Sequence, residues 1–74
     1  MSNVHTAEYQ RFLKRLRQAR IEAGLTQAQV AKLLRKRQTH VSKCELGERR
    51  VDGVELQRFA TIYKKPLDFF LAGQ

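Results

Sequence analysis

The sequence has few of the residues that cross-link or stiffen a fold or bind a metal. It has one cysteine, one proline and two histidines among 74 residues. A single cysteine cannot form an intrachain disulfide, which favours a reducing, cytoplasmic setting. The histidines and the cysteine show no recognised zinc-ligand spacing. We therefore expect no disulfide, no metal and no other cofactor.

Long apolar runs and catalytic motifs are missing as well. No stretch approaches the roughly 18 apolar residues that a membrane span requires. The N-terminus has no basic region followed by an apolar run, so we expect no secretory signal peptide. No paired catalytic carboxylates, Ser-His-Asp set or glycine-rich phosphate loop can be found, so we do not expect an enzyme.

Acidic residues are few compared with basic ones. Seven Asp and Glu stand against fifteen Lys and Arg, which gives a formal charge of +8. Such an excess in a chain of single-domain size implies a polyanionic partner, because Lys and Arg that neutralise phosphates release condensed counterions. Nucleic acid is the first candidate. An anionic membrane is the weaker one, because the basic residues are spread over several predicted helices.

Apolar residues recur at helical spacing in five segments, and no segment alternates as a strand would. Thr6 is a candidate N-cap for the first helix, and Thr26 with Gln29, like Asp52 with Glu55, forms a capping pair. Pro66 is well placed to open a short last helix. The expected helices span about 7–23, 27–34 and 38–46, then run from Asp52 to about Lys64 and from Pro66 onward. The chain is predicted to be all-α.

One short predicted helix, residues 38–46, has a polar arc and an apolar arc. Val41 and Cys44 fall on the apolar side. The polar arc carries Gln38, Thr39, Ser42 and Lys43. These are side chains that can pair with base edges in the major groove, Gln with adenine and Lys with guanine. The alternative is an ordinary amphipathic surface helix.

The basic triplet Arg35-Lys36-Arg37 precedes this helix. Cations at a helix N-terminus are electrostatically unfavourable, because that end is the positive pole of the helix dipole. A phosphate docked there would reverse the sign of the interaction. The alternative is that the long side chains extend into water. Arg20 is a separate problem, since it lies on the apolar stripe of the first helix and needs a partner.

These segments carry a family resemblance. Residues 27–46 resemble the helix-turn-helix of the Cro and phage-repressor (XRE) family of DNA-binding proteins. Three further blocks resemble family segments in the same order: Arg20-Ile-Glu-Ala-Gly-Leu-Thr-Gln, Val41-Ser-Lys-Cys-Glu-Leu-Gly-Glu-Arg-Arg and Lys65-Pro-Leu-Asp-Phe-Phe-Leu. The resemblance covers roughly residues 8–72. It implies a five-helix, lambda-repressor-like domain that binds double-stranded DNA, as a bacterial or phage transcriptional regulator of the repressor type.

The resemblance also implies roles for individual residues. Arg20 and Glu45 match a family ion pair, and Cys44 matches an inward position, with a redox switch as the alternative role. The family's base-reading positions are Gln38, Thr39, Ser42 and Lys43. We expect phosphate contacts from Gln27, Arg37 and His40, and from one or more of Arg17, Arg49 and Arg50. A homodimer is expected because one module buries too little surface for high specificity.

The last helix has a candidate dimer surface, and the turn before residues 38–46 differs from the family pattern at two positions. Phe69 and Leu71 are the candidate dimer surface, unless they complete the core. Arg35 stands where the family usually has glycine, which would strain a left-handed turn residue. Lys36 stands where the family often has an apolar residue, and Leu46 could touch a thymine methyl or cover the turn.

The chain is expected to form one domain after a short lead. We expect a flexible lead over residues 1–6 and one domain over 7–72. The main alternative function is an antitoxin-like protein-interaction module that binds DNA secondarily.

Overall fold

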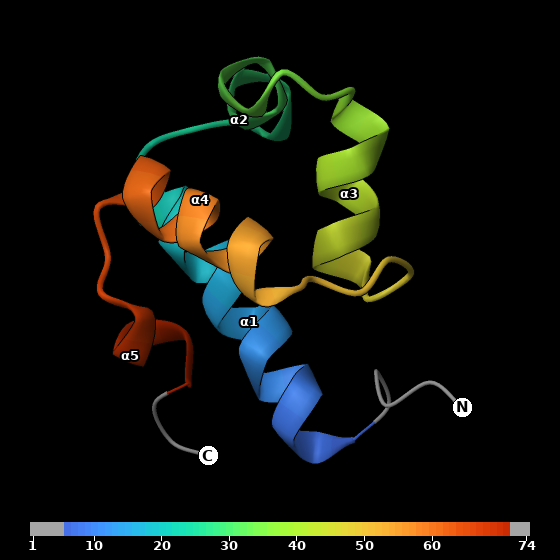
Figure 1. Cartoon of the computed structure of the whole chain (residues 1–74), viewed down its shortest axis with the longest axis vertical. Coiled ribbons are helices and arrows are strands. Elements are labelled where there is room, and N and C mark those ends of the chain that lie inside the picture. The colour runs from blue at the N-terminus through green and yellow to red at the C-terminus, as the bar shows by residue number, and fades with distance from the viewer. Residues whose placement is uncertain (1–5, 72–74) are drawn as a thin grey trace.

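The computed structural model describes residues 6–71, which fold into five helices and contain no strand (Figure 1). The helices are α1 (Ala7–Glu22), α2 (Gln27–Leu34), α3 (Gln38–Leu46), α4 (Gly53–Tyr63) and α5 (Leu67–Leu71). The all-α prediction is confirmed, and α2 and α3 have the predicted bounds. The expected lead over residues 1–6 lies outside the described part except for Thr6, and the expected last domain residue, Ala72, also lies outside it.

The first helix starts and ends by local capping. The Thr6 side chain accepts a hydrogen bond of 3.1 Å from the backbone N–H of Tyr9, as expected of an N-cap. At the other end the predicted helix is one residue too long, because Ala23 is the C-cap. Gly24 follows with φ of 72°, a left-handed conformation that glycine adopts without steric cost.

Capping boxes open both α2 and α4. In α2, Thr26 Oγ1 accepts from Gln29 N at 3.1 Å and Gln29 Oε1 accepts from Thr26 N at 2.8 Å. In α4, Asp52 Oδ1 accepts from Glu55 N at 2.8 Å, and Glu55 Oε1 accepts from Asp52 N at 3.4 Å. Each N-cap side chain is worth about 1 kcal/mol, so the sequence itself fixes where these two helices begin.

All five helices contribute to one core. Buried side chains come from every helix: Phe12, Leu13, Leu16, Ala19, Val30, Ala31, Val41, Cys44, Phe59, Ala60, Tyr63 and Phe70. Leu25 and Val51, in the connections, pack against this core without having been predicted to do so. Leu67 and Leu71 of α5 are exposed, so Leu71 does not complete the core. The five residues of α5 bury one side only, through Phe70.

The turn between α2 and α3 uses a left-handed residue. Arg35 has φ of 59° and ψ of 43°, and the next backbone N–H, of Lys36, donates to Ala31 O at 2.9 Å. A residue with a side chain pays roughly 1–2 kcal/mol for this conformation. Arginine thus adopts the left-handed conformation at the position where the resemblance implies a glycine. The strain is offset because the turn satisfies the carbonyls at the end of α2.

Candidate nucleic-acid interface

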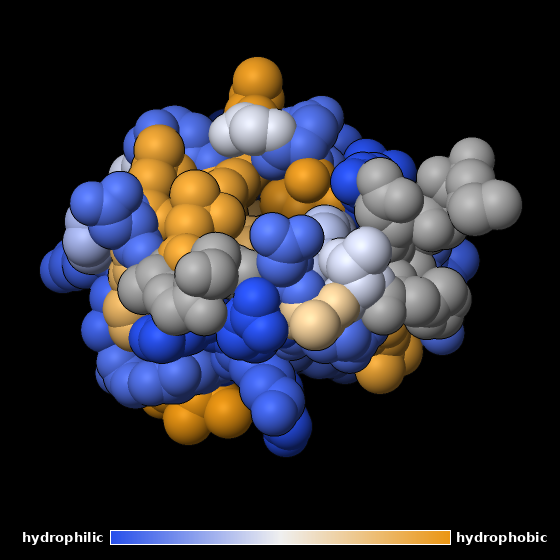
Figure 2. Space-filling model, turned by 90° about the horizontal axis from the view of Figure 1, so that it is seen from below, coloured by the Kyte–Doolittle hydropathy of each residue, from blue (hydrophilic) through white to orange (hydrophobic). Residues whose placement is uncertain are grey.

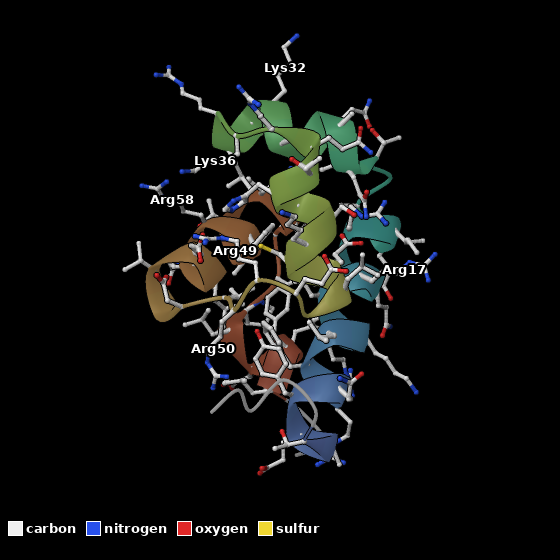
Figure 3. All side chains as sticks on the ribbon, turned by 90° about the vertical axis from the view of Figure 1, so that its right-hand side faces the viewer. Arg17, Lys32, Lys36, Arg49, Arg50 and Arg58 are labelled. Carbon is white, nitrogen blue, oxygen red and sulfur yellow. The ribbon has the colours of Figure 1, made fainter. Side chains whose placement is uncertain are left out.

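The outer face of α3 carries the four predicted base-reading side chains. Gln38, Thr39 and Lys43 are exposed and Ser42 is half-buried. Behind them Val41 and Cys44 are fully buried, each with 0% of its surface exposed. The polar arc therefore points away from the protein, and Figure 3 shows α3 on the face of the molecule that turns to the viewer. Leu46 extends this face, since it is 65% exposed at the C-terminal end of α3.

An ion pair fixes α3 to α1. Arg20 Nε donates to Glu45 Oε2 at 2.6 Å, and its Nη2 donates to Glu45 Oε1 at 3.2 Å. The two side chains are only 13% and 4% exposed. The hydrogen bond to Glu45 raises the pKa of Arg20, so the guanidinium stays charged. Arg20 Nη1 also donates to Leu25 O at 3.0 Å, which accounts for a cation on an otherwise apolar stripe.

Two glutamines connect this pair to the predicted reading face, which is the exposed arc of Gln38, Thr39, Ser42 and Lys43 on α3. Gln27 Nε2 donates to Glu45 Oε1 at 3.0 Å, and Gln38 Nε2 approaches Gln27 Oε1 at 3.5 Å. Gln27 was predicted to hold a phosphate, but both ends of its side-chain amide face partners inside the protein. Its side chain is therefore suited to orient Gln38, because a half-buried amide keeps its hydrogen bonds.

Two of the predicted phosphate residues are free cations next to α3. Arg17 of α1 lies on one side of α3 in Figure 3. Arg37 is the N-cap residue of α3, and its side chain is exposed and makes no capping hydrogen bond. Within residues 6–71 neither has an acidic partner within ion-pair distance. Both side chains can therefore bind a phosphate without giving up an ion pair within the protein.

His40 points toward α4 instead of outward. Its Nε2 lies 3.2 Å from Glu55 Oε2, and its side chain is 16% exposed. The predicted phosphate contact at His40 does not fit this position. Successive residues turn by about 100°, which puts His40 on the same inward arc as Cys44. Arg49 Nη2 donates to the same oxygen of Glu55 at 3.1 Å, although its side chain remains 47% exposed.

Arg50 lies apart from the reading face. Its guanidinium carbon is 5.3 Å from the centre of the Tyr9 ring, a cation-π contact with the first turns of α1. The Tyr9 hydroxyl accepts from Val51 N at 3.1 Å and so secures the same connection. Figure 3 places Arg50 below Arg49, toward the N-terminal turn of α1. The predicted grouping of Arg50 with the other phosphate residues does not fit this arrangement.

Cys44 is a packing residue. Burial is the main cause that raises the pKa of its thiol to about 11. The thiol stays protonated near neutral pH, and the thiolate is the reactive form. The geometry thus supports the role of a small buried hydrophobe and gives no support to a redox switch.

The predicted dimer residues differ in exposure. Phe69 is half-buried, with Lys65 Nζ at 4.6 Å and the Arg15 guanidinium carbon at 5.5 Å from its ring centre. Leu71 is 50% exposed and Leu67 42%. The last two are four residues apart and share one side of α5. Their i, i+4 spacing is the sequence signal that would have identified Leu67 as a partner of Leu71. The exposed apolar side of α5 therefore consists of Leu67 and Leu71.

Residues 6–71 offer no cluster of three metal-binding side chains. Within the same range no helix is long and apolar enough to cross a membrane.

Comparison with known proteins agrees with this geometry. The model of the helix-turn-helix family HTH_3 matches residues 16–70, which spans the last part of α1 and nearly everything after it. No curated protein and no solved structure gives a match. The matched family is a DNA-binding family of transcriptional regulators rather than a catalytic one. The chain belongs to the Cro/C1-type (XRE) helix-turn-helix family, and its fold is the lambda-repressor-like fold.

Proposed function

We propose that the protein is a repressor-type transcriptional regulator, of a bacterium or phage, that acts in the cytoplasm and recognises a specific double-stranded DNA sequence with α3. One observation carries the proposal. The exposed polar arc of α3 is supported from behind by the Arg20–Glu45 pair and two fully buried side chains. A probe held in this way keeps its orientation when it enters the major groove, which admits an α-helix.

The chemistry of the arc assigns a role to each reader. Lys43 can donate to the two acceptors of guanine, and Gln38 can pair with the donor and acceptor of adenine. Gln38 is the better defined of the two, because Gln27 lies beside its amide nitrogen. Thr39 and Ser42 provide hydroxyls that can donate or accept. The phosphate contacts that fit the structure are those of Arg17, Arg37 and Arg49, and they set the register of the complex.

A homodimer is part of the proposal. Leu71 lines a groove of about 440 Å³ with Tyr9, Val51, Leu56 and neighbouring residues. Figure 2 views the end of the molecule that carries α5 and the start of α1, and shows hydrophobic surface there beside hydrophilic residues. A two-fold dimer through this end would cover the groove and present two α3 helices to two half-sites.

Selection of binding sites from random duplexes at physiological salt tests the proposal. We expect an enriched sequence with two-fold symmetry. Absence of any enriched sequence would refute specific DNA recognition and favour the protein-interaction module. An enriched site without symmetry would leave recognition in place and remove the dimer.

Alanine variants then test the readers. We expect Lys43→Ala and Gln38→Ala each to cost roughly 1–3 kcal/mol on the selected site and to relax preference at single base positions. Gln57→Ala, an exposed position on α4, is the control and should leave affinity unchanged. Equal losses on selected and random DNA would show that Lys43 and Gln38 do not read bases.

A further inference from the structure

The two long edges of α3 face different parts of the protein. On one edge Glu45 and Gln38 meet residues of α1 and α2. Arg17 and Glu45 line a common groove on that side. On the other edge His40 meets Glu55 of α4. The reading face is therefore bordered by α1 on one side and by α4 on the other, as Figure 3 shows.

Two cations on the α4 side are not among the phosphate contacts of Arg17, Arg37 and Arg49. Lys36, from the turn before α3, and Arg58, from α4, line the same small hollow as His40 and Glu55. Both side chains are exposed. Figure 3 shows Lys36, Arg49 and Arg58 on one side of α3 and Arg17 on the other. The cations thus occur on both sides of the reading face.

The charges on the α4 side are unbalanced. Glu55 is the carboxylate in this hollow, and its Oε2 lies close to both His40 and Arg49 while its Oε1 caps α4. Within residues 6–71 neither Lys36 nor Arg58 has an acidic partner within ion-pair distance. Unpaired cations around one shared carboxylate repel one another. An anion placed between them and solvent would relieve that repulsion.

We propose that Lys36 and Arg58 form a second backbone contact on the α4 side of α3, next to Arg49, and that this contact binds a phosphate of the DNA strand opposite the one held by Arg17. The inference rests on the proposed function. The major groove is about 12 Å wide, close to the diameter of a helix with its side chains, so both walls lie near a helix that enters it. Contacts to both walls fix the rotation of α3 about its own axis, which contacts to one wall leave free.

Arg58 shows why the sequence could not reveal this contact. It lies outside the helix-turn-helix segment, and its spacing within α4 resembles that of any solvated residue. Only the packing of α4 against α3, through Glu55 and His40, brings it beside the reading helix.

The test is the salt dependence of DNA affinity for Lys36→Gln, Arg58→Gln and the double variant. In the double variant the slope of log K against log salt should become shallower by about 0.9, because one phosphate contact releases about that many counterions, and each single variant should show part of that change. Affinity should weaken by the same factor on selected and random DNA, with base preference unchanged. Arg58→Lys keeps the charge and should keep the slope.

Arg11→Gln is the matched control, because it removes the same charge from an exposed position on α1. Thermal melts of all variants check that the fold is intact. If the variants have the wild-type slope, or lose no more than Arg11→Gln does, the second contact is refuted while DNA binding stands. If the wild-type chain itself does not bind duplex DNA, the proposed function and this inference both fail.

Discussion

The α2–α3 pair and the α4–α5 pair are built by the same local rules, yet only the α2–α3 pair carries the polar arc that we propose as a reading surface. Both begin with a capping box, at Thr26 and at Asp52. Both first helices end at a left-handed cation, Arg35 with φ of 59° and Lys64 with φ of 57°. In both turns the following lysine N–H bonds back to an alanine carbonyl, at 2.9 and 3.0 Å.

The second helix of each pair is where they differ. The helix α3 has nine residues and turns a polar arc outward. The helix α5 has only five residues and exposes Leu67 and Leu71. Each pair is also tied to α1 by an ion pair of 2.6 Å. Arg20 and Glu45 are 13% and 4% exposed, while Lys65 and Glu22 are 25% and 42% exposed.

The turn alone therefore does not make a recognition motif. A capped helix, a left-handed residue and a second helix occur twice in this small protein. The proposed reading surface lies where the second helix is long enough to have two faces and is held by a buried ion pair. Substitutions in the two ion pairs and at the two left-handed residues test this conclusion.

The largest effect is expected from the buried pair. Glu45→Gln leaves Arg20 largely buried without its carboxylate, and we expect a loss of about 2–4 kcal/mol in the free energy of unfolding, near the range for broken buried pairs. Chemical denaturation measures it. Glu48→Gln removes the same charge from an exposed neighbour and should cost little. A double-mutant cycle with Arg20→Gln that shows no coupling would contradict the assignment.

Glycine at the two left-handed positions should have an intermediate effect, and the same one in both turns. Arg35→Gly and Lys64→Gly remove a conformational strain of roughly 1–2 kcal/mol but add freedom to the unfolded chain, which leaves a net gain of about 0.5–1 kcal/mol each. Thermal melts measure the gain. A gain at Lys64 but none at Arg35 would show that the two turns are not equivalent, and that Arg35 makes a compensating contact.

The smallest effect is expected from the exposed pair. Glu22→Gln should lower the melting temperature by less than roughly a third of the fall caused by Glu45→Gln, because solvent screens exposed ion pairs. Hydrogen bonds from Lys65 and Gln18 lower the pKa of Glu22 below its usual 4.5. A lowered folded-state pKa stabilises the fold above the unfolded value, and this contribution is lost as the pH falls through the folded-state pKa.

The melting temperatures of the wild type and of Glu22→Gln should therefore converge as the pH falls. The difference in melting temperature between wild type and Glu22→Gln should be present at pH 7 and vanish at acidic pH. A difference that grows on acidification would contradict the sign of the pKa shift.

Local sequence determined the elements of this protein. Caps at Thr6, Thr26 and Asp52 fixed where helices begin, since a side-chain oxygen three residues from an amide needs no distant partner. The period of the apolar residues separated the polar and buried arcs of α3. Arg20 on an apolar stripe already indicated a missing partner, and the family resemblance named Glu45.

Tertiary structure decided which side chains are free to bind. Glu55 draws His40 and Arg49 to α4, and Glu45 engages Gln27, because carboxylates at helix contacts take the nearest donors. The same packing brings Arg58 beside α3. A helical wheel gives the direction of a side chain from its own axis, but not which neighbouring helix lies in that direction. The sequence therefore determined that α3 has an exposed polar arc, which we propose as the reading face, and only the packing of α1, α2 and α4 decided which cations border it.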